Sequence, residues 1–208
     1  MLLDNKNAVI YGAAGAVGNT VSRAFAREGA RLFLTARNVA TLEPLAAELS
    51  AAGAIVNVAQ VDALDEQAIA THLSSVVRQG STIDISFNAI GIPQEGMQGI
   101  PFTELPVESF ALPFDTYPRS HFLTGRAAAQ HMIAQRSGVV LMYTPDPARL
   151  GTPLLGGMSG AWAAMESLNR AISAEWATPW GARRVLAHHR DTGNRNYRCR
   201  LRAACRRT

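Results

Sequence analysis

The sequence predicts an α/β domain built on a doubly wound parallel sheet. Short apolar runs recur along the chain, and each is followed by a longer segment with a period near 3.6 residues. Strands that alternate with helices in this way pair in parallel through right-handed crossovers. A chain of 208 residues that is 48% hydrophobic is also long enough to bury one sizeable core. We therefore expect a single three-layer domain.

Five strands are expected, at Asn7–Tyr11, Arg31–Thr35, Ile55–Val61, Ile83–Phe87 and Gly138–Tyr143. The first helix has Val17, Val21 and Phe25 on one face. Gly29 ends this helix. Residues 90–114 are rich in Pro and Gly and have no steady period, which predicts a loop with at most one helical turn. Because ligands of doubly wound sheets bind beyond the carboxyl ends of the strands, the functional residues are sought just after each strand.

A glycine-rich segment, YGAAGAVG, joins the first strand to the first helix. Its glycines permit a tight turn and close approach of the backbone to a diphosphate, and the amino terminus of the helix favours negative charge. An ordinary strand-to-helix turn is the alternative, because Gly and Ala are common in such turns. The predicted diphosphate contacts are Gly12, Gly15, Ala16, Val17 and Gly18.

A basic residue, Arg37, follows the second strand. Sites for NAD usually have an acidic residue here, which binds the ribose hydroxyls. An arginine suits the extra phosphate of NADP instead. The alternative interpretation is an ordinary solvent-exposed arginine at the start of a helix. NADP is therefore the predicted cofactor, ahead of NAD. The third and fourth strands end in VDALD, with Asp62, and in FNAIG, with Asn88.

With these four segments in order, the chain resembles the short-chain dehydrogenase/reductases over about residues 6–182. The resemblance implies a Rossmann-type fold, a nicotinamide dinucleotide cofactor, a small carbonyl or alcohol substrate and a homo-oligomer. It also implies that the glycine loop holds the diphosphate, that the third segment contacts adenine, and that the fourth packs beside the cofactor. The cofactor contacts expected in these last two segments are Asp62, Ala63, Asn88, Ala89 and Gly91.

The proton-transfer groups of this family are not found at their expected positions. Alignment of the helix ESLNRAISAE places the family's tyrosine at Met158 and its lysine at Trp162. Methionine has no proton to exchange, and an indole is only a neutral donor. The family's serine falls on Thr144 or Pro145, and its asparagine falls near Tyr117. No catalytic residue is assigned, and two functions stay open: a divergent oxidoreductase, or a cofactor-binding protein without turnover.

Nearby polar groups have simpler structural interpretations. Tyr143 is expected on a packed face of the fifth strand, and Thr144 is expected to bond locally at its end. His121 and His131 are interpreted as satisfied helix residues. Met158 and Trp162, four residues apart, are expected to form an apolar wall or a packed helix face.

A remote alternative is a serine hydrolase, because GMSGA at 157–161 approaches the nucleophile elbow G-x-S-x-G. The elbow requires a strand immediately before its serine, and GTPLLGG is a poor strand sequence.

The basic residues are concentrated at the carboxyl end. Residues 183–208 hold nine arginines and one acid, which leaves eleven basic and fifteen acidic residues before them, so the net charge of +4 hides an acidic body. We therefore divide the chain into a domain at 1–182 and a basic tail at 183–208 that is disordered or translated in a shifted reading frame. On this interpretation, the last strands of the sheet are missing or disordered. Both cysteines, Cys199 and Cys205, lie in this tail.

The same composition excludes several classes of function. An acidic body is a poor surface for nucleic acid. No apolar run approaches the length of a membrane span, and the amino terminus does not resemble a signal peptide, so we expect a cytoplasmic protein with no membrane partner. No metal site is predicted.

Overall fold

A computed structural model describes residues 1–176 and 187–191. Parallel strands form one sheet in the order β3-β2-β1-β4-β5-β6. This is the order of the Rossmann fold. The strands are β1 (Asn7–Tyr11), β2 (Arg31–Ala36), β3 (Val56–Gln60), β4 (Ile85–Asn88), β5 (Val139–Pro145) and β6 (Ala187–Asp191). The helices are α1 (Ala16–Arg27), α2 (Glu43–Ala51), α3 (Glu66–Gly80), α4 (Val107–Ala134) and α5 (Met158–Trp176), with short 3-10 turns η1 (Val39–Leu42) and η2 (Asp146–Ala148).

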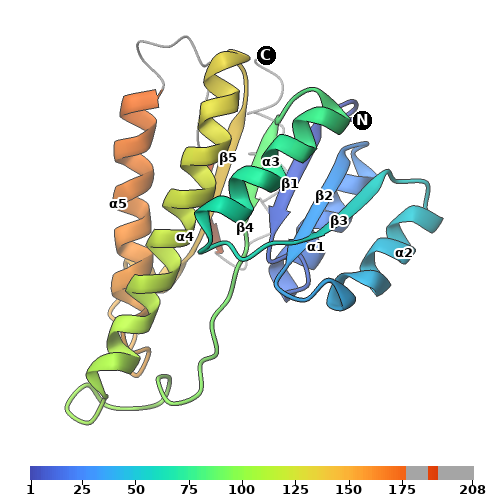
Figure 1. Cartoon of the computed structure of the whole chain (residues 1–208). Coiled ribbons are helices and arrows are strands. Elements are labelled where there is room, and N and C mark those ends of the chain that lie inside the picture. Colours follow the sequence, from blue (N-terminus) through green and yellow to red (C-terminus); the bar gives the residue numbers. More distant parts are fainter. Residues whose placement is uncertain (177–186, 192–208) are drawn as a thin grey trace.

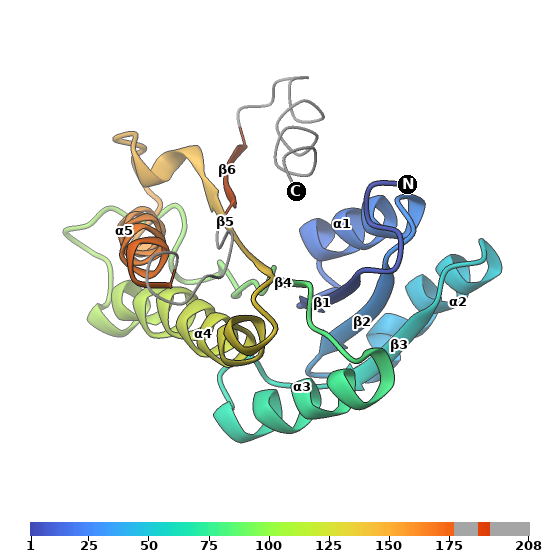
Figure 2. The same ribbon diagram turned by 90° about the horizontal axis from the view of Figure 1, so that it is seen from above.

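Helices cover both faces of the sheet, as the two views of the ribbon show (Figures 1 and 2). On one face α3, α4 and α5 pack against alternate residues of the strands, including Val9, Phe33 and Val140. On the other face α1 and α2 pack against the intervening residues, including Ile10 and Leu34. Because both faces are covered, the central strands do not alternate between buried and exposed residues, and every residue of β1 and β4 is buried.

The predicted fold class is confirmed, and the expected strands lie within a few residues of the observed ones. The tail expected at 183–208 contributes one strand, β6, which pairs in parallel with β5. The hypothesis of a shifted reading frame otherwise concerns residues outside the described ranges, as do both cysteines.

The expected loop at 90–114 is wrong in its second part, because α4 begins at Val107. Its two internal prolines, Pro113 and Pro118, hide the helical period from the sequence. A proline inside a helix removes one backbone hydrogen bond. Here tertiary packing outweighs that loss: Tyr117, just beyond Pro113, is buried in a cluster with Ala161 and Met165 of α5.

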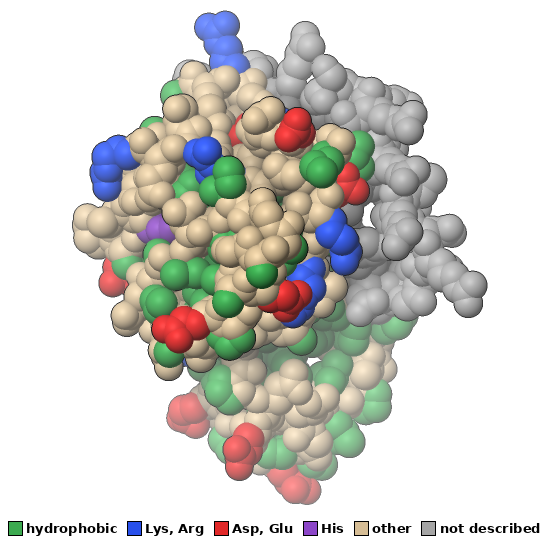
Figure 3. Space-filling model, turned by 90° about the vertical axis from the view of Figure 1, so that its right-hand side faces the viewer, with side chains coloured by type: hydrophobic (Ala, Val, Ile, Leu, Met, Phe, Trp, Pro, Cys, Tyr) green, Lys and Arg blue, Asp and Glu red, His purple; other side chains and the backbone are tan. Residues whose placement is uncertain are grey.

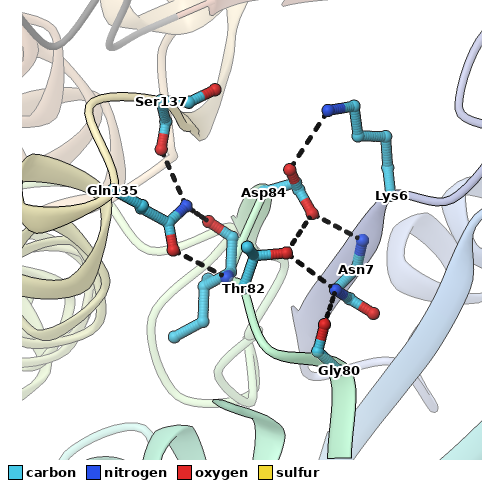
Figure 4. A network of polar contacts seen from close by, with 8 residues as sticks. Lys6, Asn7, Gly80, Thr82, Asp84, Gln135 and Ser137 are labelled. Atoms are coloured by element: carbon cyan, nitrogen blue, oxygen red, sulfur yellow. Dashed lines mark hydrogen bonds and ion pairs between the residues drawn. The ribbon is translucent and has the colours of Figure 1, made fainter.

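A polar network closes the end of the sheet where the strands begin (Figure 4). The Asn7 side chain donates to the Gly80 carbonyl and to Thr82 Oγ1, both at 2.9 Å. Asp84 accepts from the Asn7 backbone amide at 3.0 Å, from Thr82 Oγ1 at 2.8 Å and from Lys6 Nζ at 3.2 Å. The network therefore joins β1 to the segment between α3 and β4.

Gln135 extends this network to β5. Its amide nitrogen donates to the carbonyls of Ile83 at 2.7 Å and Ser137 at 2.8 Å, and its oxygen accepts from the Ile83 amide at 3.2 Å. The starts of β1, β4 and β5 are thus held together by side chains. Ligands of doubly wound sheets bind at the opposite edge, where the strands end.

Both Lys or Arg and Asp or Glu side chains are scattered over the face of the molecule seen in Figure 3, with only acidic ones among the charged side chains at its lower end. The face as a whole therefore carries charges of both signs. In the part of the chain that the structure describes, no helix has the length and apolar character needed to cross a membrane. Within the same residues, His, Cys, Asp and Glu do not gather in groups of three or more that could hold a metal ion.

Candidate functional site

The glycine-rich bend lies where β1 and β4 end side by side. Tyr11 pairs with Asn88 in the sheet, and the Ala89 amide donates to the Tyr11 carbonyl at 2.9 Å. Gly12 has φ +68°, and a Cβ on it would come within 2.8 Å of the Ile90 Cα. The bend therefore contacts the turn after β4 through backbone alone, which requires glycine. This is the point at which the strand order reverses, where doubly wound sheets bind their ligands.

The start of α1 forms a cradle that fits a diphosphate. A Cβ on Gly18 would lie 2.4 Å from the Gly12 carbonyl oxygen, so helix and bend pack directly against each other. Gly15 caps α1 without any side-chain hydrogen bond, and Gly15 and Ala16 are exposed. Amide groups of the first helical turn therefore face solvent without a side-chain acceptor. An anion at this position is stabilised by those amides and by the helix dipole.

Arg37 and Asp62 follow neighbouring strands at the same edge. The Val61 amide donates to the Ala36 carbonyl at 3.0 Å, which brings the ends of β2 and β3 together. Arg37 is exposed. Asp62 is also exposed, and its Oδ1 accepts from the Leu64 amide at 2.9 Å, which fixes the turn before α3. Its neighbour Ala63 is buried in the core beneath α3.

The turn after β4 is fixed by its asparagine. Asn88 is buried, its Oδ1 accepts from the Ile90 amide at 3.0 Å, and its Nδ2 donates to Thr124 Oγ1 at 3.2 Å. These bonds hold the backbone of Ala89 and Ile90 beside the glycine bend. A Cβ on Gly91 would meet nothing within 4 Å, so the chain is open just beyond the turn. The sequence-predicted cofactor residues thus all lie along one edge of the sheet.

An apolar cluster occupies the part of this edge near α4 and α5, where the family's tyrosine and lysine are expected. Met158 begins α5 and is 1% exposed. The Trp162 ring lies 6.2 Å from the Tyr117 ring, centre to centre and tilted by 44°. Ile92, from the loop after β4, packs against the same cluster. Met158 and Trp162 therefore belong to packed helix surface, which was one of the two expectations for them.

The Tyr117 hydroxyl points toward the loop after β4. Burial raises the pKa of this phenol, against a smaller lowering effect of the neighbouring Ile92 backbone. Sequence reasoning placed Tyr117 at the asparagine position but assigned it no role.

His121, one turn along α4 from Tyr117, is buried, and its ring is hydrogen bonded to the Tyr117 carbonyl. Its Nδ1 lies 2.9 Å from the Tyr117 carbonyl oxygen, so it donates there, and Nε2 is buried without a protein partner. The expectation of a fully satisfied histidine is therefore wrong for one ring nitrogen. Burial lowers the pKa of His121 to about 4, against smaller opposing effects of the Tyr117 and Asn88 carbonyls. His121 is neutral near pH 7.

The side chains at the end of β5 pack within the protein. Thr144 is 1% exposed, and Tyr143 packs on the core beneath α1 and α2, as expected for this strand. Residues 151–157 contain turns and no strand, and Ser159 lies within α5 with a buried hydroxyl that has no protein partner. A nucleophile elbow requires a strand before its serine. The serine hydrolase alternative is therefore wrong.

Comparisons with known proteins agree with this geometry. A family model described as enoyl-(acyl carrier protein) reductase matches residues 12–183. Gluconate 5-dehydrogenase of Gluconobacter oxydans is 25% identical over 174 residues, which are 84% of this chain and 66% of that protein. The 1-deoxy-11-beta-hydroxypentalenate dehydrogenase of Streptomyces exfoliatus is 29% identical over 94% of this chain and 66% of its own length.

Solved structures show the same fold. A short-chain type dehydrogenase/reductase from Mycobacterium marinum superposes with a TM-score of 0.79 and 26% identity, over 87% of this chain and 72% of the other. A metagenomic short-chain oxidoreductase, solved with NADP, gives a TM-score of 0.81 at 23% identity, over 91% of this chain and 83% of the other. The fold and these matches place the chain among the Rossmann-fold proteins.

More narrowly, the chain belongs to the short-chain dehydrogenase/reductase family. It spans 66% of the length of the two curated relatives described above.

Proposed function

We propose that this protein binds a nicotinamide dinucleotide along the carboxyl edge of β3, β2, β1 and β4, with NADP preferred over NAD. The observation that carries the proposal is the glycine cradle: bend and helix meet through backbone at Gly12 and Gly18, and the first turn of α1 is open to solvent. A diphosphate has the charge and size for that place. Arg37 would meet the additional phosphate, and Asp62 the adenine end.

The reaction supported best is oxidation or reduction of a small carbonyl or alcohol, in the manner of the family, with altered proton-transfer groups. Relatives named as dehydrogenases of gluconate and of a hydroxypentalenate support this reaction type. A structure named as an NADP complex and another named as an NAD⁺-bound xylitol dehydrogenase support the cofactor class. We expect the protein to act in the cytoplasm, with the homo-oligomer that the family resemblance implies.

A second candidate is a nicotinamide-binding protein without turnover. It is favoured by the apolar cluster of Tyr117, Trp162 and Met165, which stands where the family's proton relay is expected. Consumption of NADPH with a panel of ketones and aldehydes separates the two candidates. Binding without consumption supports the second.

Cofactor binding and its selectivity are tested with Arg37→Ala. NADPH affinity, followed by quenching of tryptophan fluorescence, is expected to fall about 10- to 100-fold, since hydrogen bonds to charged groups are worth about 1.5–3 kcal/mol. NADH affinity should stay the same. Arg27→Ala is the matched control, because Arg27 is equally exposed but lies at the far end of α1. Equal effects on both dinucleotides, or none on either, would contradict the assignment of Arg37.

A further inference from the structure

We propose that Tyr117 is the proton donor of this site. It would take over the role of the family's tyrosine and lysine, whose aligned positions are occupied here by Met158 and Trp162. This inference rests on the proposed oxidoreductase function. In it, the Tyr117 hydroxyl protonates the oxygen of a carbonyl substrate whose carbon receives hydride. The donor thus comes from α4 instead of α5.

The first argument is position. Tyr117 lies on α4, and its ring packs against Trp162 of α5. Ile92, which follows the end of β4 at Asn88 by four residues, packs against the same cluster as the Tyr117 ring. The phenol therefore reaches from α4 to the carboxyl edge of the sheet, on the same β4 turn that contacts the glycine bend. A substrate placed between that turn and α5 meets the Tyr117 hydroxyl.

The second argument is the supply of protons. The side chains that pack with Tyr117 in this cluster are apolar or a neutral indole, namely Ala161, Met165, Ile92, Phe114 and Trp162. Of these, methionine and alanine have no proton to exchange, and an indole N–H is not an acid near neutral pH. The phenol of Tyr117 is the group in this cluster that exchanges a proton.

The third argument is chemical balance. A reduced nicotinamide, when bound, supplies hydride to the carbonyl carbon. The π electrons of the C=O bond move to the oxygen, the O–H bond of Tyr117 breaks, and its proton forms the new alcohol O–H. The phenolate that remains is stabilised by the Ile92 backbone and regains its proton from water. Hydride from a bound reduced nicotinamide and the Tyr117 proton would together balance the reduction, with water restoring the phenol.

The environment of Tyr117 also favours the protonated form of its phenol. Burial raises its pKa above the ordinary value, so the phenol is fully protonated at neutral pH. It is still far more acidic than an alcohol, and it can therefore protonate a developing alkoxide. Little phenolate is therefore present at neutral pH to accept a proton from an alcohol. We thus expect oxidation of alcohols to speed up as the pH rises.

His121 is a positioning residue for this donor. Its Nδ1 holds the Tyr117 carbonyl at 2.9 Å, and Ser120 Oγ donates to the same carbonyl at 3.1 Å. These bonds fix the backbone of Tyr117 in the turn beside Pro118, where the normal helical hydrogen bond of the proline nitrogen is missing. The ring of Tyr117 is thereby held against Trp162.

The test compares Tyr117→Phe with Tyr143→Phe, a matched tyrosine on β5 that packs on the other side of the sheet. Removing the donor should lower kcat for NADPH-dependent ketone reduction by about 100-fold or more, the usual contribution of a general acid. NADPH affinity and the thermal midpoint should hardly change, since the ring remains. Tyr143→Phe should keep kcat within about threefold of the wild type, well below the general-acid effect.

A second readout does not depend on turnover. The infrared C=O stretch of ¹³C-labelled acetophenone is measured in the complex of the wild-type protein with NADP⁺. A hydrogen bond from Tyr117 shifts this band to lower frequency than in water-free solvent, and Tyr117→Phe should abolish the shift.

The proposal is overturned if Tyr117→Phe keeps kcat, or if the wild type binds NADPH but neither reduces carbonyls nor shifts the band. In that last case the cofactor site still stands. If the wild type fails to bind NADPH, the proposed function itself is lost, and the role of Tyr117 with it.

Discussion

The polar network at the amino ends of the strands should contribute to stability without contributing to cofactor binding. Asn7→Ala tests this separation. Asn7 is 4% exposed, and its Nδ2 makes two hydrogen bonds of 2.9 Å, to the Gly80 carbonyl and to Thr82 Oγ1. A Cβ on Gly80 would lie 2.6 Å from Asn7 Oδ1, so the asparagine fills a space that only glycine leaves open.

The size of the effect follows from these two bonds. Each contributes a net of about 0.5–1.5 kcal/mol, so their loss should lower the free energy of unfolding by about 1–3 kcal/mol. Near the middle of that range, about 2 kcal/mol, the thermal midpoint of a domain of this size falls by about 4–8 °C. Asp84 keeps its bonds to the Asn7 backbone amide, to Thr82 and to Lys6, so the rest of the network survives.

Thermal and urea unfolding measure this loss, and fluorescence quenching by NADPH measures the site. Asn57→Ala is the matched control, because Asn57 lies on the outer strand β3 and takes no part in the network. We expect the midpoint to fall only in Asn7→Ala, with NADPH affinity unchanged in both variants. A midpoint within 1 °C of the control, or a parallel loss of NADPH affinity, would show that the reasoning about the two ends of the sheet is wrong.

Two further predictions concern the buried histidines and the glycine cradle. Burial lowers the pKa of His72 and of His121 to about 4, well below the ordinary value of 6.5, so the unfolded chain takes up protons first as the pH falls. The free energy of unfolding should therefore be fully retained above pH 6.5 and decline from there toward pH 4, with a shallower decline in His72→Gln; equal slopes in urea titrations across this range would contradict the assignment. In Gly18→Ala the new methyl group would lie 2.4 Å from the Gly12 carbonyl oxygen, so both NADPH affinity and the thermal midpoint should fall, whereas Gly151→Ala, where nothing lies within 4 Å, should leave both unchanged.

Local chemistry was sufficient to predict the central sheet and the residues along its carboxyl edge. The strands can be recognised in the sequence as apolar runs because both faces of a parallel sheet are covered. Gly12 and Gly18 could be found for a related reason, since a backbone that touches backbone excludes every side chain. Arg37, Asp62 and Asn88 could be placed because the residue after a parallel strand always lies at the ligand edge.

Packing between distant segments decided what the sequence left open. The start of α4 at Val107 was missed because Pro113 and Pro118 break the local pattern, and the helix is stabilised by its packing against α5, α3 and the sheet. Whether Tyr117 meets Trp162 and Ile92 depends on how α4 and α5 lie against the sheet, and the unpaired Nε2 of His121 depends on the same packing.

The sequence alone therefore predicted the fold class and the glycine bend, because each depends on residues that are neighbours along the chain. The replacement of the family's tyrosine and lysine by Met158 and Trp162 stays a prediction from the same sequence. Only the tertiary structure decided which groups surround Trp162. Those groups come from α4, α5 and the loop after β4, which meet when the apolar faces of the helices are buried together.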